Sequence, residues 1–244
     1  MSLKEAVLLQ YKMAKNEEYV YEIVVDSNRE AKTNEGNQQE HDLLKMRMTQ
    51  KITAVHPDGS YSLEMLVEPK QLVRNGQEIR VDPMQQRVNM RMSKSGELLE
   101  TSLQGPATNP SFPTRPVFVG ETWEGESKVN LQDPATGQPL PPVGLKFNYT
   151  FQGIEKMKGY DCAKIIVKNP ETEIPLSPGI VQKITANGSN YFAHKEGRLV
   201  KSEVETRIVM THPEITLYNN IRITVDLVQA PQGFSSNEEF LISG

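Results

Sequence analysis

The chain has 244 residues, of which 37% are hydrophobic and 24% are charged, and its formal net charge is −4. This composition is enough for a folded core, and the scattered Lys and Arg residues argue against a nucleic-acid-binding face. The single cysteine excludes an internal disulfide, and the lack of a run of roughly 18 apolar residues excludes a membrane-spanning helix.

Alternation of apolar and polar residues predicts strands with one buried face along most of the chain. Residues 3–15 have apolar spacing that fits either a helix or a first strand. Residues 44–55 alternate, and the turn at 56–59 joins them to a return strand over 61–68. Asn75-Gly76 marks the next hairpin. We expect further strands around 87–92, 145–152, 163–167, 200–210 and 215–227.

Two proline-rich stretches interrupt this pattern, at residues 105–116 and 133–142. Proline removes ladder donors, so we interpret the first stretch as the connection between two halves of the chain. The halves comprise residues 1–116 and 117–229, or they merge into one continuous domain. Residues 230–244 lose the alternation and are expected to form a loosely held tail.

The two halves share a pattern at an offset near 100 residues. The turn and strand that begin at Gly59 recur at Gly159, and those that begin at Gly96 recur at Gly197. An internal duplication would explain why these turns and strands recur in the same order in both halves. The alternative is chance recurrence of strand and turn residues. We predict an all-β fold of about twelve strands, in two related antiparallel halves that form a curved two-layer sheet or an incomplete barrel.

Several motifs resemble those of a bacterial family of exported or lipid-anchored β-rich proteins of unknown function. These motifs are Tyr19 and Tyr21, residues 116–123 (PVFVGETW), residues 159–165 (GYDCAKI), Tyr191-Phe192, and residues 197–200 (GRLV). The resemblance covers most of residues 10–229 and implies an extracytoplasmic location, in the envelope or outside the cell. It supplies no catalytic residues. We read Met1-Ser2-Leu3, which has no charged or apolar leader, as a start placed after a removed leader.

A more distant analogy of architecture links the predicted fold to lipoprotein-carrier-like domains, in which a curved antiparallel sheet shields a hydrophobic ligand. This chain lacks the helices that cover such a sheet in those carriers.

The sequence offers no recognisable catalytic or metal-binding motif. The four histidines are dispersed, and neither a phosphate-binding glycine loop nor a nucleophile elbow is present. We therefore expect no metal, no cofactor and no enzymatic activity, and we interpret Cys162 as a small buried apolar residue. A hydrolase is the third hypothesis, and it would need Glu203 and Glu205 to meet Glu64 or Glu68, although solvated charge is the ordinary explanation of these carboxylates.

Methionine is the unusual feature, with ten in the chain, of which seven besides Met1 lie in the first half. Surfaces rich in methionine adapt to apolar ligands, whereas methionines that fill gaps in a core need no such role. The candidate ligand-binding residues are Met46, Met48, Met65, Met90 and Met92.

The leading hypothesis is a non-enzymatic envelope or extracellular module. It would hold a hydrophobic small molecule, a lipid or a partner protein in a cleft between the two halves. The alternative is a structural or assembly protein whose long final strands pair with another subunit through exposed strand edges.

Overall fold

The structure is a computed structural model that describes residues 6–81, 85–102, 110–129, 137–138, 141, 143–177 and 179–231. The described residues form twelve strands. These are β1 (Glu18–Thr33), β2 (Gly36–Val55), β3 (Tyr61–Arg74), β4 (Gln77–Ile79), β5 (Gln86–Met92), β6 (Leu98–Thr101), β7 (Thr122–Val129), β8 (Val143–Met157), β9 (Tyr160–Ser177), β10 (Ile180–Ala193), β11 (Arg198–His212) and β12 (Ile215–Gln229).

All of the strands belong to one antiparallel sheet in the order β6-β5-β3-β2-β1-β12-β11-β10-β9-β8-β7, with β4 paired to β3. The first and last strands are neighbours, from Val20 opposite Gln229 to Thr33 opposite Ile215. The expectation that the long final strands offer a free edge is therefore wrong, because β11 and β12 are each paired on both sides. Among the described strands, β6 and β7 lie at the two ends of the sheet.

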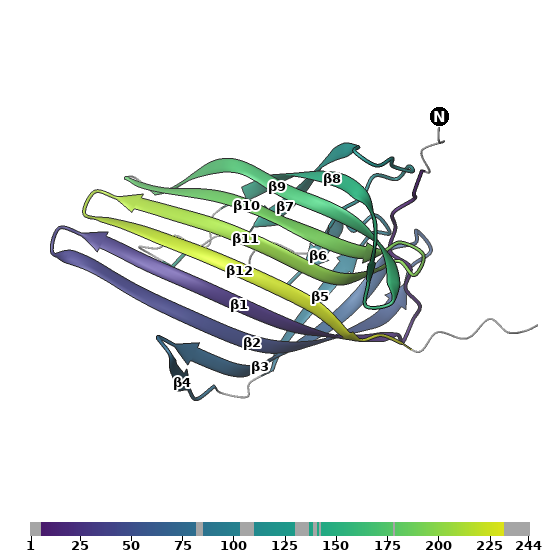
Figure 1. Ribbon diagram of the computed structural model, residues 1–244, viewed down its shortest axis with the longest axis horizontal. Coiled ribbons are helices and arrows are strands. Elements are labelled where there is room, and N and C mark those ends of the chain that lie inside the picture. Colours follow the sequence, from purple (N-terminus) through teal and green to yellow (C-terminus); the bar gives the residue numbers. More distant parts are fainter. Residues whose placement is uncertain are drawn as a thin grey trace, which may run out of the picture.

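The sheet curls into a trough that is not closed into a barrel (Figure 1), which confirms the predicted all-β incomplete barrel. On β1, Tyr19 and Tyr21 are buried while Glu18 and Glu22 are exposed. We call the side of the sheet that carries Tyr21 the inner face and the opposite side the outer face. The alternation predicted for residues 44–55 and 61–68 matches β2 and β3, because one face of each strand must avoid water.

Residues 6–15, the N-terminal segment, form no helix and cross the trough as an extended chain. Val7, Leu9 and Tyr11 are buried, whereas Leu8 is 41% exposed, so the segment follows the period of an extended chain. Val7 and Val117 exchange two backbone hydrogen bonds of 2.9 Å and thereby form an isolated bridge. The segment thus pairs with the stretch that contains Val117 and adds buried side chains to the core.

The main core fills the end of the trough at which this segment lies, which we call the closed end. The rings of Tyr11, Phe112 and Phe192 meet with centroid distances of 4.6 to 5.6 Å. Trp123 and Tyr149 stack nearby on β7 and β8, with their centroids 5.8 Å apart. Residues from both halves of the chain therefore share one core. The opposite end of the trough, where the β1–β2 and β11–β12 hairpins turn, is the open end (Figure 1).

Two glycine turns hold the N-terminal segment from opposite sides. The backbone N–H of Tyr11 donates to Lys94 O at 2.8 Å, and that of Lys12 donates to Gly197 O at 3.0 Å. Gly96 and Gly197 both have positive φ, at 87° and 69°. The predicted equivalence of these turns fits this arrangement, and the duplication itself stays a prediction.

Residues 105–109 of the first proline-rich stretch and most of the second stretch lie outside the described residues, as does the predicted tail from residue 232 onward. Residues 110–121 are described and run along the closed end, where they bury Phe112 and Val117. This part of the first connection therefore belongs to the core rather than to an exposed linker.

Candidate functional site

The inner face changes character along the length of β1. Tyr19 and Tyr21 belong to the core, Ile23 and Val25 are half-buried, and Ser27 and Arg29 follow toward the open end. Side chains two residues apart share a face, so this strand carries an apolar stretch followed by a polar one. On β2 the same order runs from the half-buried Leu44 to Asp42 and Glu40.

Strand register gathers six polar inner-face residues into one group, the polar belt. On β1 and β2, Ser27 lies opposite Asp42 and Arg29 lies opposite Glu40. Pairing of β2 with β3 adds Arg74, and pairing of β1 with β12 adds Asn219. The polar belt comprises Ser27, Arg29, Glu40, Asp42, Arg74 and Asn219.

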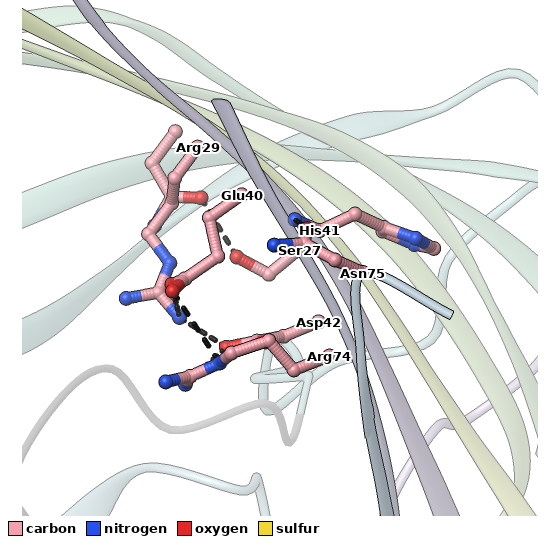
Figure 2. Close-up of polar contacts among 8 residues, drawn as sticks. Ser27, Arg29, Glu40, His41, Asp42, Arg74 and Asn75 are labelled. Carbon is pink, nitrogen blue, oxygen red and sulfur yellow. Dashed lines mark hydrogen bonds and ion pairs between the residues drawn. The ribbon is translucent and has the colours of Figure 1, made fainter. Parts of the chain in front are cut away.

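Asp42 is the centre of the polar belt (Figure 2). Arg74 donates to its carboxylate through Nε and an Nη atom, at 2.8 and 2.9 Å, and Arg29 donates to the same carboxylate. Glu40 forms ion pairs with Arg29 at 2.9 Å and with Arg74 at 3.4 Å. The hydroxyl of Ser27 donates to Asn219 Oδ1 at 2.9 Å. The belt therefore contains a network of two arginines and two carboxylates, with the Ser27–Asn219 pair beside it.

Residues outside the belt hold Arg74 in place. Asn75 has a positive φ of 49° and follows Arg74 at the end of β3. The side-chain oxygen of Asn75 accepts a 2.8 Å hydrogen bond from the backbone N–H of His41. The backbone N–H of Asn75 donates to His41 O, also at 2.8 Å. The His41 ring points to the other side of the sheet (Figure 2), where it contacts Asp26 at 2.9 Å.

The two arginines stabilise the charged form of Asp42. The hydrogen bonds from Arg74, together with the positive charges of Arg74 and Arg29, lower the pKa of the Asp42 carboxyl from its usual value. Asp42 is therefore ionised throughout the neutral range. The network holds two positive and two negative side chains, so it is close to neutral overall.

An open groove of about 590 Å³ lies beside the polar belt on the inner face. One wall carries the polar side chains of Arg29, Gln38 and Glu40, from β1 and β2. The other wall carries Ile208, Met210 and Leu217, from β11 and β12. We call it the inner groove. Its volume lies within the roughly 300–1,000 Å³ typical of ligand sites.

Half-buried apolar residues cover the inner face between the polar belt and the core. On β1, β2 and β12 these are Ile23, Val25, Leu44, Met46, Ile221 and Ile223. A second buried cluster of Leu145, Ile174, Leu176 and Ile184 packs against Ile208 and Met210 from the other side. The inner groove therefore opens onto continuous apolar surface.

The structure places all five predicted methionines on the inner face, in two environments. Met65, Met90 and Met92 are buried in the main core. Met46 and Met48 are half-buried on β2, opposite Ile23 and Tyr21. None of the five lines the inner groove, whose apolar wall has Met210 instead. Their role in ligand binding stays a prediction.

The carboxylates of the hydrolase hypothesis are not brought together. Glu203 and Glu205 lie on the outer face of β11, where they pair with Lys201 and Arg222. Glu64 and Glu68 lie on β3, which is separated from β11 by β2, β1 and β12. In the part of the chain that the structure describes, no group of three or more His, Cys, Asp or Glu side chains gathers as metal ligands would.

Cys162 is fully buried in the main core and unpaired, as its interpretation as a small apolar residue predicts. Burial raises the pKa of its thiol to about 11, so the thiol is protonated at neutral pH. Within the described residues there is no helix long and apolar enough to cross a membrane.

Sequence reasoning did not identify the polar belt. The available signal was a break in the apolar alternation, because Ser27 and Arg29 occupy inner-face positions after Ile23 and Val25. Such a break gains meaning only when the pairing of β1 with β2 and β12 is known.

No family model matches the sequence, and no curated protein matches it. Among solved structures, the chain is similar to the translocator domain of autotransporter NalP from Neisseria meningitidis. The sequence identity is 9%, the match covers 85% of this chain and 88% of that chain, and the TM-score is 0.21. A TM-score this low does not indicate a shared fold or a shared function. Of the predicted resemblance to exported bacterial proteins, the β-rich architecture is confirmed, and the rest stays a prediction.

Proposed function

We propose that the protein is a non-enzymatic binding module that holds an amphipathic molecule in the inner groove. The observation that carries this proposal is the pairing of an apolar wall of Ile208, Met210 and Leu217 with a polar wall that includes Arg29 and Glu40. An amphipathic ligand satisfies both walls at once. The groove is lined by strands from both halves of the chain, as the hypothesis of a cleft between the halves requires.

The apolar surface beyond the groove gives the ligand a source of binding free energy. Ile23, Val25, Leu44 and Ile223 are only half-buried although they lie on the inner face. Covering such surface contributes about 25 cal/mol for each Å² removed from water. A ligand whose apolar part follows these residues toward the core therefore gains affinity without any movement of the sheet.

The proposal includes the extracytoplasmic location that the sequence resemblance implies. Fractionation of cells that produce the full-length gene product tests this part. Recovery with the periplasmic, envelope or secreted fraction supports it, and recovery with the cytosolic fraction contradicts it.

Native mass spectrometry of the purified chain tests the binding function, because it measures the mass of the protein with any co-purifying molecule. We expect a monomer that carries one small amphipathic molecule, identified after solvent extraction. A dimer without a small molecule would favour assembly through the edges of β6 and β7 instead. The variant Met210→Gln is the control, because it places an amide in the apolar wall and should reduce the ligand-bound fraction.

A further inference from the structure

We propose that Arg29 and Arg74 form a headgroup site for an anionic amphiphile, and that Glu40 is the side chain that the headgroup displaces. This inference rests on the proposed binding function and adds the charge and chemistry of the ligand. The headgroup is a carboxylate or a phosphate, because a guanidinium binds both through paired N–H donors.

Asp42 and Glu40 contact the same two arginines in different surroundings. The side chain of Asp42 is only 10% exposed and accepts hydrogen bonds from both guanidiniums. The side chain of Glu40 is 34% exposed and lines the inner groove. Asp42 therefore positions the arginines, while Glu40 occupies the place that a soluble anion can reach.

The arginines keep donors for an additional anion. Their side chains are 47% and 44% exposed. Arg29 binds Asp42 and Glu40 through a single Nη atom, and Arg74 binds Asp42 through Nε and one Nη atom. A guanidinium has five N–H donors, so each arginine can bind an anion while it keeps its contact with Asp42.

Exchange of Glu40 for a ligand headgroup preserves the charge balance at the arginines. An ion pair as exposed as Arg29–Glu40 contributes little to stability, about 0–1 kcal/mol, so its loss is readily offset. Glu40 can extend into solvent because it lies toward the open end. A bound headgroup then leaves its apolar chain beside Ile208, Met210 and Leu217 on the opposite wall.

Competition binding with the full chain tests the inference. The neutral fluorophore N-phenyl-1-naphthylamine is the probe, and the competitors are dodecanoate, dodecyl phosphate, dodecanol and dodecyltrimethylammonium, which share one chain length. We expect the anions to displace the probe at concentrations about tenfold lower than dodecanol, which corresponds to about 1.4 kcal/mol. Whichever anion competes better identifies the headgroup as carboxylate or phosphate.

Variants separate a headgroup contact from a general effect on the fold. Arg29→Gln should remove the preference for anions and leave displacement by dodecanol unchanged. Glu40→Gln should strengthen binding of the anions several-fold, and this second variant keeps the test valid if Arg29→Gln does not fold. Arg222→Gln, which removes the same charge from an outer-face pair with Glu205, should have no effect on either class of competitor.

The outcomes distinguish this inference from the function on which it rests. Equal competition by dodecanoate, dodecyl phosphate and dodecanol would overturn the headgroup site and leave the binding function standing. An equal loss of anionic and neutral binding in Arg29→Gln would also overturn it. If neither the probe nor any competitor binds, the proposed function fails and this inference fails with it.

Discussion

The guanidinium of Arg74 binds the carboxylate of Asp42 through two parallel hydrogen bonds, of 2.8 and 2.9 Å. The two residues lie opposite each other on β3 and β2, near the open end of the trough. Strand register therefore sets this contact, and the same carboxylate also accepts a hydrogen bond from Arg29, which lines the inner groove. We therefore expect changes in this network to affect both the stability of the fold and the binding of a ligand in the inner groove.

Replacement of Asp42 by Asn should destabilise the protein by about 2 kcal/mol. The change removes charge-assisted hydrogen bonds from two arginines and leaves their positive charges unbalanced. Urea unfolding measures the free energy of unfolding. Asp26→Asn is the matched control, because Asp26 pairs with His41 on the exposed outer face and should cost less than about 1 kcal/mol. Equal losses in the two variants would show that the polar belt does not stabilise the fold.

The contribution of Asp42 should depend on pH with a defined sign. Its folded-state pKa is lowered, so the stabilisation is fully present above the unfolded value of about 3.9 and is lost as pH falls through the folded pKa. Urea unfolding of the wild-type protein and Asp42→Asn at a series of pH values measures the difference. The two free energies should converge below pH 4, and a gap that stays constant down to pH 2 would contradict the assignment.

Replacement of Gly197 by Ala should destabilise the fold more than the same change at Gly76. Both glycines have positive φ, at 69° and 79°, so both variants carry the backbone cost of an L-residue there. A methyl group at Gly197 would lie 2.5 Å from the backbone N of Lys12, whereas at Gly76 it meets no atom within 4 Å. Crowding of the N-terminal segment should add about 1–3 kcal/mol. Thermal unfolding measures this, and equal shifts would mean that the segment does not contribute to stability.

The methionines should divide into two functional classes. Met92 is 1% exposed in the main core, and Met92→Ala should cost about 2–5 kcal/mol of stability. Met46 is half-buried on the inner face, and Met46→Ala should cost less stability while it weakens binding of N-phenyl-1-naphthylamine. Chemical unfolding and probe titration of both variants check the division. Unchanged probe binding in Met46→Ala would limit the role of this methionine to packing.

Much of the fold follows from local sequence. The alternation in β2 and β3 and the His56–Gly59 turn between them are present in the residues themselves, because a half-buried strand needs period two and a tight turn needs positive φ. For the N-terminal segment, local sequence alone does not decide between a helix and a strand. Its apolar residues fit a helical spacing, but contact with Val117 and the aromatic core selects an extended chain.

The candidate site depends on pairings that local sequence does not contain. Ser27 and Asn219 are 192 positions apart and meet because β1 pairs with β12. Arg29, Asp42 and Arg74 come from three strands, and a shift of one residue in any of them would send its side chain to the outer face. The expectation of a free edge at the final strands was wrong because it also depended on strand pairing. The partner of β12 is the first strand, which local sequence does not reveal.

Titration of the delipidated full chain with N-phenyl-1-naphthylamine tests the proposed binding function most directly, when wild-type protein is compared with Met210→Gln and Thr211→Gln. These adjacent residues lie on opposite faces of β11, and only Met210 lines the inner groove. We predict saturable binding of one probe molecule per chain, at least about tenfold weaker in Met210→Gln and unchanged in Thr211→Gln. No saturable binding to the folded wild-type protein, or equal affinity in all three proteins, would contradict a ligand site in the inner groove.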